Sequence, residues 1–309
     1  MNGTHIKRAR ISSGVLTADV MEYGAVLADV RLDGVAHGLT LSLPSLEAYQ
    51  RDDAHIGAIA GPVAGRIAGG RFEIDGCVSH TTRNDGENTL HGGGQGFGCQ
   101  DWTLAERGPD FALLTLFRDD GAAGFPGPMQ ASCLYQVVDN RLSITLEATT
   151  ARPTLCNLAQ HSYFNLSGAG VIDDHNLLVA SNQITPFGAD LLPTGTIETA
   201  PKDLDFLQRR AIGTTAIDAH FVLSDTRREP RFAAALSSES VSMRLSTTEP
   251  GLVIYTADML NTPPFGPRSG ICLEPQSWPD AINQPNFPSM ILRPQEVYHQ
   301  ETILEFMAT

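Results

Sequence analysis

Four ionisable residues stand in apolar or Gly-Pro contexts, where side chains that can transfer protons are uncommon. His91 precedes three glycines, and His161 lies within the segment QHSYFNL. Asp218 precedes AHFV, and Glu274 lies between the apolar run ICL and the dipeptide Pro-Gln. Imidazoles and carboxylates that share a pocket can give protons to a bound substrate and take them from it. Taken singly, each residue equally fits a turn or a strand end, so these positions are pocket candidates only.

Three catalytic motifs are present only in part. The glycine-rich segment 57–70 lacks the GxxxxGK[ST] pattern of a phosphate-binding loop, and strand-like sequence follows it instead of a helix. The segment 91–94 (HGGG) resembles the oxyanion loop of some esterases, but the chain has no GxSxG nucleophile elbow. It also has no HExxH motif, which excludes a zincin-type metal centre.

The charge of the chain restricts its partners. Lysine and arginine number 21 against 35 acidic residues, which gives a net charge of −14 over 309 residues and a pI near 4.9. Such a chain repels phosphate backbones and anionic lipid surfaces, so we expect no nucleic-acid or membrane partner. No apolar run approaches the ~20 residues that cross a bilayer. Residues 1–10 are basic without an apolar stretch behind them, so we expect no secretory signal.

The cysteines are few and scattered. None forms a CxxC pair, and they stand at Cys77, Cys99, Cys133, Cys156 and Cys272. An odd, unclustered set predicts reduced thiols in a cytoplasmic protein, and neither a disulfide framework nor a cysteine metal site.

Period-two alternation dominates the chain and predicts half-buried strands. The predicted inward faces are Phe111, Leu113, Thr115 and Phe117; Leu142, Ile144, Leu146 and Ala148; and Thr302, Leu304 and Phe306. Asp-Gly pairs at 33–34, 75–76, 85–86 and 120–121 favour tight hairpin turns. Helices are predicted only at 45–50, capped by Ser45, and at 229–238.

The chain shows no linker, charge block or internal repeat that would divide it. The 29 glycines and 19 prolines favour many short elements. We therefore predict an all-β fold, a large antiparallel β-sandwich with a few short helices, that forms one domain over 1–309.

Seven distinctive blocks are distributed along nearly the whole chain. They are 61–68 (GPVAGRIA), 88–93 (NTLHGG), 157–166 (NLAQHSYFNL), 191–195 (LLPTG), 218–221 (DAHF), 250–256 (PGLVIYT) and 270–281 (GICLEPQSWPDA), continued by 283–288 (NQPNFP). In wording and order these blocks resemble the aldose 1-epimerase (galactose mutarotase) family. The resemblance implies a galactose mutarotase-like supersandwich, in agreement with the alternation. It also implies that the chain interconverts the α and β anomers of a free monosaccharide, without a metal or an organic cofactor.

The resemblance also implies roles for five residues. Glu274 matches the family's catalytic base, and His161 matches its catalytic acid. His91 matches a second pocket histidine that donates a hydrogen bond to the sugar, and Arg66 and Asp218 match residues that bind sugar hydroxyls. We expect the nearby arginine and carboxylates to keep His161 cationic near neutral pH.

The chain departs from the family pattern at several positions. They are Pro62 in place of Arg, Gly65 and Gly69 in place of Asn, Gln160 in place of Asn, Ala219 in place of His, and Val253 in place of a frequent Gln. The positions of Gly65 and Val253 contact sugar in the family. Because polar contacts are lost while the catalytic pair is kept, we expect a preferred sugar other than galactose, such as a deoxy sugar or a pentose.

Three alternatives remain open at this point. A hexose-6-phosphate mutarotase needs extra basic residues at its pocket, which an acidic chain with Pro62 does not favour. A glycoside hydrolase would use Asp218 and Glu274 as its carboxylate pair. A non-catalytic sugar-binding β-sandwich would keep the pocket without needing the acid–base pair. The sequence leaves the oligomeric state, monomer or homodimer, undecided.

Overall fold

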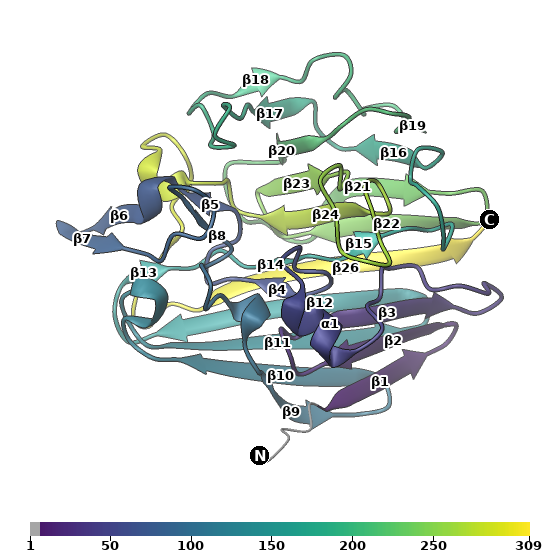
Figure 1. The fold of residues 1–309 in the computed structure, drawn as a ribbon, viewed down its shortest axis with the longest axis horizontal. Helices are drawn as coiled ribbons and strands as arrows, with labels where there is room; N and C mark the ends of the chain where they lie inside the picture. Colours follow the sequence, from purple (N-terminus) through teal and green to yellow (C-terminus); the bar gives the residue numbers. More distant parts are fainter. Residues whose placement is uncertain (1–6) are drawn as a thin grey trace.

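The computed structural model describes residues 7–309, and its largest element is a nine-stranded sheet. The strand order is β19-β16-β21-β22-β26-β12-β11-β10-β9. The strands are β9 (Thr103–Arg107), β10 (Phe111–Arg118), β11 (Met129–Val138), β12 (Arg141–Thr150), β16 (Asn176–Val179), β19 (Arg210–Ala211), β21 (Arg231–Ser237), β22 (Val241–Thr247) and β26 (Tyr298–Ala308). The last strand of the chain, β26, lies at the centre of this sheet between β12 and β22 (Figure 1).

A six-stranded sheet, in the order β15-β24-β23-β20-β17-β18, carries two of the candidate residues. Its strands are β15 (Tyr163–Phe164), β17 (Gln183–Thr185), β18 (Glu198–Thr199), β20 (Asp218–Val222), β23 (Gly251–Tyr255) and β24 (Ile271–Gln276). The N-terminal strands β1 (Arg8–Ser13), β2 (Leu16–Met21) and β3 (Leu27–Leu32) form a separate three-stranded sheet.

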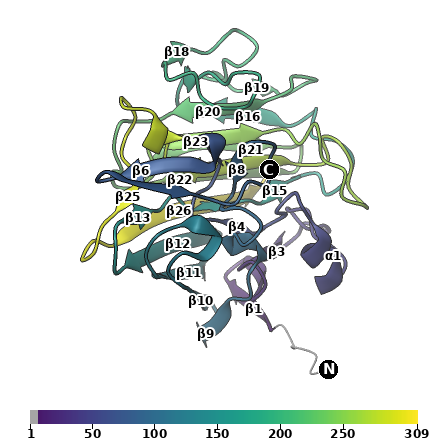
Figure 2. The ribbon, with the colours of Figure 1, turned by 60° about the vertical axis from the view of Figure 1, so that its left-hand side comes forward.

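The remaining elements are short. Four strand pairs are β4 (Ile59–Ala60) with β14 (Ala159–Gln160), β5 (Arg66–Ile67) with β8 (Thr89–Leu90), β6 (Arg71–Ile74) with β7 (Cys77–His80), and β13 (Thr154–Leu155) with β25 (Ile291–Leu292). The hairpin β6–β7 projects from the left of Figure 1 and comes forward in Figure 2. The helices are α1 (Leu46–Arg51) and the single 3₁₀ turns η1 (Ala68–Gly70), η2 (Phe97–Cys99), η3 (Ala122–Gly124) and η4 (Ala281–Asn283).

One hydrophobic cluster joins the three larger sheets. It contains Ile11 of β1, Leu146 of β12 and Ile254 of β23, each at most 1% exposed. Every pair of named strands in residues 7–309 is antiparallel. Alternation places one face of each long strand in this core, so the predicted all-β, antiparallel class is confirmed.

Several predicted elements are confirmed. The faces at 142–148 and at 302–306 are buried as predicted. Helix α1 begins after Ser45, whose hydroxyl accepts a hydrogen bond from the Ala48 N–H at 3.2 Å. The pair Asp75-Gly76 forms the tight β6–β7 hairpin, with both residues at positive φ, as a type I′ turn requires.

The predicted helix at 229–238 is wrong, because this segment is strand β21. It pairs with β16 on one side and β22 on the other, with a bulge between Phe232 and Ala234. Its alanines favour a helix locally, but two neighbouring strands satisfy its backbone groups and override that preference.

The predicted face of the strand at 111–117 is also wrong. Ala112, Leu114 and Leu116 of β10 point into the core, whereas Phe117 is 61% exposed. The register of β10 against β11 decides the face, and a shift of one residue exchanges the two faces.

The other three Asp-Gly pairs also form turns, but none is the two-residue loop between two named strands. The pair 33–34 follows β3, the pair 85–86 lies within an isolated bridge, and the pair 120–121 lies in the long connection from β10 to β11. The tight hairpins β1–β2 and β11–β12 instead turn at 14–15 and 139–140, where Gly14 and Asp139 have positive φ.

In the described part of the chain, no helix has the length and apolarity needed to cross a membrane. The expectation about a secretory signal concerns residues 1–10, of which 1–6 lie outside the described residues. All five cysteines are free thiols in the structure.

Strand β26 offers a test of this core. Leu304 is 2% exposed, whereas Met307 of the same strand is 52% exposed. We expect Leu304→Ala to lower the free energy of unfolding by about 2–5 kcal/mol, because it leaves a cavity between two sheets. The control Met307→Ala should change it by less than about 0.5 kcal/mol. Urea denaturation measures both, and equal effects would contradict the assigned faces.

Candidate active site

One cavity of about 480 Å³ brings together all five residues that the sequence analysis singled out. These residues come from separate elements and are Arg66 of β5, His91 after β8, His161 between β14 and β15, Asp218 of β20, and Glu274 of β24. A cavity of this size suits a small organic ligand.

The imidazole of His161 and the carboxyl of Glu274 lie close together in this cavity and are both buried. His161 Nε2 lies 3.7 Å from Glu274 Oε1, and the two side chains are only 7% and 3% exposed. Burial lowers the pKa of His161 to about 4. Burial, with a smaller contribution from Asp218, raises the pKa of Glu274 to about 8. The expectation that His161 stays cationic is therefore wrong for the unliganded site, because loss of hydration outweighs the attraction of nearby carboxylates.

The backbone fixes the tautomer of His91. The Gly65 N–H donates to His91 Nδ1 at 3.2 Å, so the neutral ring carries its proton on Nε2. Burial lowers the pKa of His91 well below its ordinary value, and the neighbouring His55, His161 and Arg66 lower it further. His91 is thus a neutral hydrogen-bond donor, held in a left-handed conformation (φ 52°).

Arg66 and Asp218 supply charge to the cavity. Arg66 Nε donates to Asp85 Oδ2 at 2.6 Å, which orients the guanidinium. Its two terminal nitrogens have no protein partner among residues 7–309, so they are available to a ligand. The pKa of Asp218 is raised overall, because the effect of burial exceeds the opposing effect of the positive charge of Arg66.

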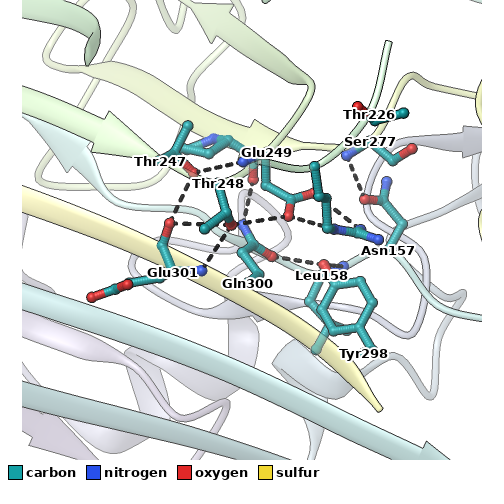
Figure 3. A network of polar contacts seen from close by, with 12 residues as sticks. Asn157, Leu158, Thr226, Thr247, Thr248, Glu249, Ser277, Tyr298, Gln300 and Glu301 are labelled. Carbon is teal, nitrogen blue, oxygen red and sulfur yellow. Dashed lines mark hydrogen bonds and ion pairs between the residues drawn. The ribbon is translucent and has the colours of Figure 1, made fainter. Parts of the chain in front are cut away.

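Asn157 ties the two sides of the site together. Its Oδ1 accepts from the Ser277 N–H at 2.7 Å, three residues beyond Glu274 (Figure 3). Its Nδ2 donates to the Ala64 carbonyl at 3.2 Å, and the Ala64 N–H donates to the Asn157 carbonyl at 2.6 Å. One buried side chain therefore connects the segment that carries Arg66 with the end of β24.

A second buried chain of hydrogen bonds connects strand β24 to strand β26. The Tyr298 hydroxyl accepts from the Leu158 N–H at 3.0 Å and donates to Gln300 Oε1 at 2.7 Å (Figure 3). Gln300 Nε2 then donates to the Pro275 carbonyl at 2.8 Å. The residue next to Glu274 is thereby fixed to the central strand of the large sheet.

Only two of the departures from the family pattern line the cavity, Gly65 and Val253. A Cβ added at Gly65 would meet Gln276 Oε1 at 3.5 Å and Pro279 Cβ at 3.7 Å, which are ordinary contacts. Val253 lies directly opposite Glu274 in the β23–β24 pair. Pro62, Gly69, Gln160 and Ala219 do not line the cavity, and Gln160 instead bonds Ser162 and the Gly57 carbonyl.

Sequence reasoning missed several polar residues of the cavity, among them His55, Asp85 and Gln276. Asp85 looked like a turn residue, because it belongs to an Asp-Gly pair. Gln276 follows Glu274 by two residues, and this period-two spacing in a strand was an available signal that both side chains share a face. Nothing in the sequence distinguished His55 from the other histidines.

The site also contains a possible set of metal ligands. One donor atom each from His161, Cys272 and Glu274 lies within 4.8 Å of the others. However, burial and the neighbouring Glu274 raise the pKa of the Cys272 thiol well above its ordinary value. Metal ligation requires a thiolate, so this donor set fits a metal poorly and fits proton transfer between His161 and Glu274 better.

The chain is similar to known proteins over nearly its whole length. The family model for aldose 1-epimerase matches residues 7–305. The galactose mutarotase of Mus musculus is 33% identical, over 98% of this chain and 95% of its own. The aldose 1-epimerase of Escherichia coli K12 is 31% identical, over 95% and 92%.

Two solved structures share the fold. An aldose epimerase homologue from C. elegans superposes with a TM-score of 0.93 at 26% identity, covering 98% of this chain and 99% of its own. The galactose 1-epimerase of Lactobacillus acidophilus gives 0.88 at 27% identity, covering 100% and 96%. The expected galactose mutarotase-like fold is confirmed, and the chain belongs to the aldose 1-epimerase family, whose members are isomerases.

Proposed function

We propose that this protein is an aldose 1-epimerase that interconverts the α and β anomers of a free monosaccharide other than galactose. The observation that carries the proposal is the buried pair His161 and Glu274, 3.7 Å apart in a cavity that Arg66, His91 and Asp218 also line. An acid and a base beside each other in a cavity with polar side chains are what ring opening of a cyclic sugar requires.

Ring opening needs two proton transfers. In the ionised form of the pair, the Glu274 carboxylate removes the proton of the anomeric hydroxyl, and the His161 imidazolium donates a proton to the ring oxygen. The C1–O5 bond breaks, and C1 becomes the carbonyl carbon of an aldehyde. After rotation about C1–C2, His161 takes the proton back from O5 while Glu274 returns its proton to O1, which closes the opposite anomer. Neither protons nor electrons are lost in the cycle.

Burial favours one direction of this exchange. Opening converts a carboxylate and an imidazolium into a neutral acid and a neutral imidazole. The same burial that raises the pKa of Glu274 and lowers the pKa of His161 stabilises that neutral pair. The neutral pair is also the resting form, so a proton must pass from Glu274 to His161 before the ring opens, and opening returns the pair to its neutral form. Arg66, Asp218 and the Nε2–H of His91 are assigned to binding the sugar hydroxyls.

A hexose-6-phosphate mutarotase finds less support. A sugar phosphate needs several cations, and in the described chain Arg66 is the only Lys or Arg that lines the cavity, where it already pairs with Asp85.

The absence of amide side chains at Gly65 and Val253 supports a sugar that presents less polarity there, such as a deoxy sugar or a pentose.

The setting of the protein is part of the same proposal. Five free thiols support a cytoplasmic location. A cluster of buried residues that joins the three larger sheets supports one domain over 1–309. We propose that the protein works as a monomer or homodimer, without a nucleic-acid or membrane partner and without a metal or organic cofactor.

The first test removes the base. We expect Glu274→Gln to lower kcat by about 10²- to 10⁴-fold while the sugar still binds, because the amide keeps the shape but accepts no proton. The control Glu239→Gln changes an exposed carboxylate and should keep the wild-type rate. NMR saturation exchange on a fresh α-anomer measures the rate. A background rate in both the wild-type protein and Glu274→Gln would indicate a sugar-binding module instead.

The second test is the pH profile. The pair carries one exchangeable proton between the pKa of His161, about 4, and that of Glu274, about 8. Below this window both groups are protonated and no base remains, and above it no acid remains. We expect kcat/KM to reach a plateau inside the window and to fall on both sides. An alkaline limb near pH 6.5, the ordinary value for histidine, would show that burial does not set the titration.

The third test concerns the sugar. Gly65 has φ 76°, a conformation that Asn tolerates best after Gly. We expect Gly65→Asn combined with Val253→Gln to raise kcat/KM for galactose by about tenfold relative to the sugar that the wild type prefers, through restored hydrogen bonds. Gly69→Asn is the matched control, because Gly69 also has positive φ (61°) but lies outside the cavity. Fastest wild-type turnover with galactose would contradict the proposal.

A further inference from the structure

A third histidine, His55, stands beside the two already described. Its ring centroid lies 5.0 Å from that of His91, edge to face, and 6.2 Å from that of His161. It lines the same cavity and keeps partial exposure there. The mechanism above gives this ring no role, since His161 and Glu274 carry both proton transfers.

The backbone at His55 is held in an unfavourable conformation. Its φ is 55°, in the left-handed region that a residue with a Cβ seldom adopts. Asp52 holds the turn on both sides, because its two carboxylate oxygens accept from the Ala54 N–H at 3.0 Å and the Ile56 N–H at 2.6 Å. Strain that the surrounding structure maintains in this way is concentrated at functional sites.

The same turn is attached to the catalytic histidine. The Gly57 N–H donates to the His161 carbonyl at 3.0 Å, and the His161 N–H donates to the Ala58 carbonyl at 2.9 Å. The Tyr163 hydroxyl donates to the Ala54 carbonyl at 3.0 Å. The position of the His55 ring is therefore fixed relative to His161, as a specific contact with a small ligand requires.

The nitrogens of the His55 ring have no hydrogen-bond partner in residues 7–309, whereas two neighbouring groups of the cavity are bonded. His91 Nδ1 is bonded to Gly65, and Arg66 Nε is bonded to Asp85. A neutral imidazole offers one donor and one acceptor, which is the pattern that a secondary hydroxyl complements.

We propose that His55 is a substrate-binding residue that determines specificity by hydrogen-bonding one hydroxyl of the sugar. The inference rests on the proposed function of the cavity and names the chemistry of one further contact in it. His55 lies next to His91, which accepts a hydrogen bond from the Gly65 N–H, and all three residues line the cavity in which the family's amide at position 65 is missing. The recognised group is an uncharged hydroxyl. Burial lowers the pKa of His55 to about 4, so the ring is neutral when the enzyme works.

The test compares sugars that lack single hydroxyls. Calorimetry measures the Kd of the preferred sugar and of its monodeoxy analogues for the wild type, His55→Gly and His55→Phe. Glycine relieves the backbone strain and removes the ring, whereas phenylalanine keeps a ring without nitrogens. A loss common to both variants therefore comes from the missing nitrogens. His80→Asn changes an exposed histidine of β7 and serves as the control.

We expect both variants to raise Kd for the parent sugar by about tenfold, the effect of one hydrogen bond. For one deoxy analogue, the Kd of the wild type should rise by the same factor. The variants should bind this analogue no more weakly than the parent sugar, because removing the hydroxyl and removing the ring nitrogens abolish the same contact. An equal loss for every sugar in the panel, or an unchanged Kd for the parent sugar, would overturn the proposal.

Sugar binding does not require turnover, so the proposed His55 contact and the proposed enzymatic function can be disproved independently. Selective weakening in the His55 variants, together with a wild-type anomer-exchange rate at background, would support the His55 contact and remove the enzymatic function. A wild type that exchanges anomers, with variants that weaken all sugars alike, would do the reverse. Absence of any sugar binding to the wild type would overturn both.

Discussion

The burial of the Glu274 carboxyl beside the His161 imidazole is the central physical constraint on this structure. Glu274 and His161 lie 3.7 Å apart with side chains 3% and 7% exposed. Water would hold this pair as two ordinary ions, but burial raises the pKa of the carboxyl and lowers the pKa of the imidazole. A proton can then pass between the two groups through a bound sugar at little electrostatic cost. A buried acid–base pair is weak evidence for stability in general, so the presence of this pair argues for chemistry.

The fold keeps this pair in place by joining segments that are far apart in sequence. Asn157 links the segment carrying Arg66 to the end of β24, and Gln300 fixes the residue after Glu274 to strand β26. The histidines at 55 and 91 both occupy left-handed conformations, which side-chain and backbone hydrogen bonds around them maintain. Rigid sheets therefore supply the carboxylates Glu274 and Asp218, while constrained turns and short strands supply the other groups.

Strands with one buried face could be predicted from the sequence. Features that depend on contacts between distant segments could not. Alternation was sufficient at 142–148, but it failed at 231–237, where an alanine-rich strand resembles a helix. The meeting of His161 with Glu274 followed only from resemblance to a family, because periodicity relates neighbours and not segments 113 positions apart (274 − 161). The cationic state expected for His161 was wrong because a sequence shows which charges exist but not how deeply they are buried. His55 escaped notice because its position depends on a turn that Asp52 holds.

The most direct test of the account observes the carboxyl of Glu274 itself. Carbon-13 NMR of the protein labelled at glutamate side-chain carboxyls, with Glu274→Gln to assign the signal, follows its protonation as the pH is raised. The account predicts that this carboxyl is protonated at neutral pH and titrates with a midpoint near 8. A midpoint near 4.5, as for a glutamate in water, would show that the group is hydrated and would contradict the buried acid–base pair.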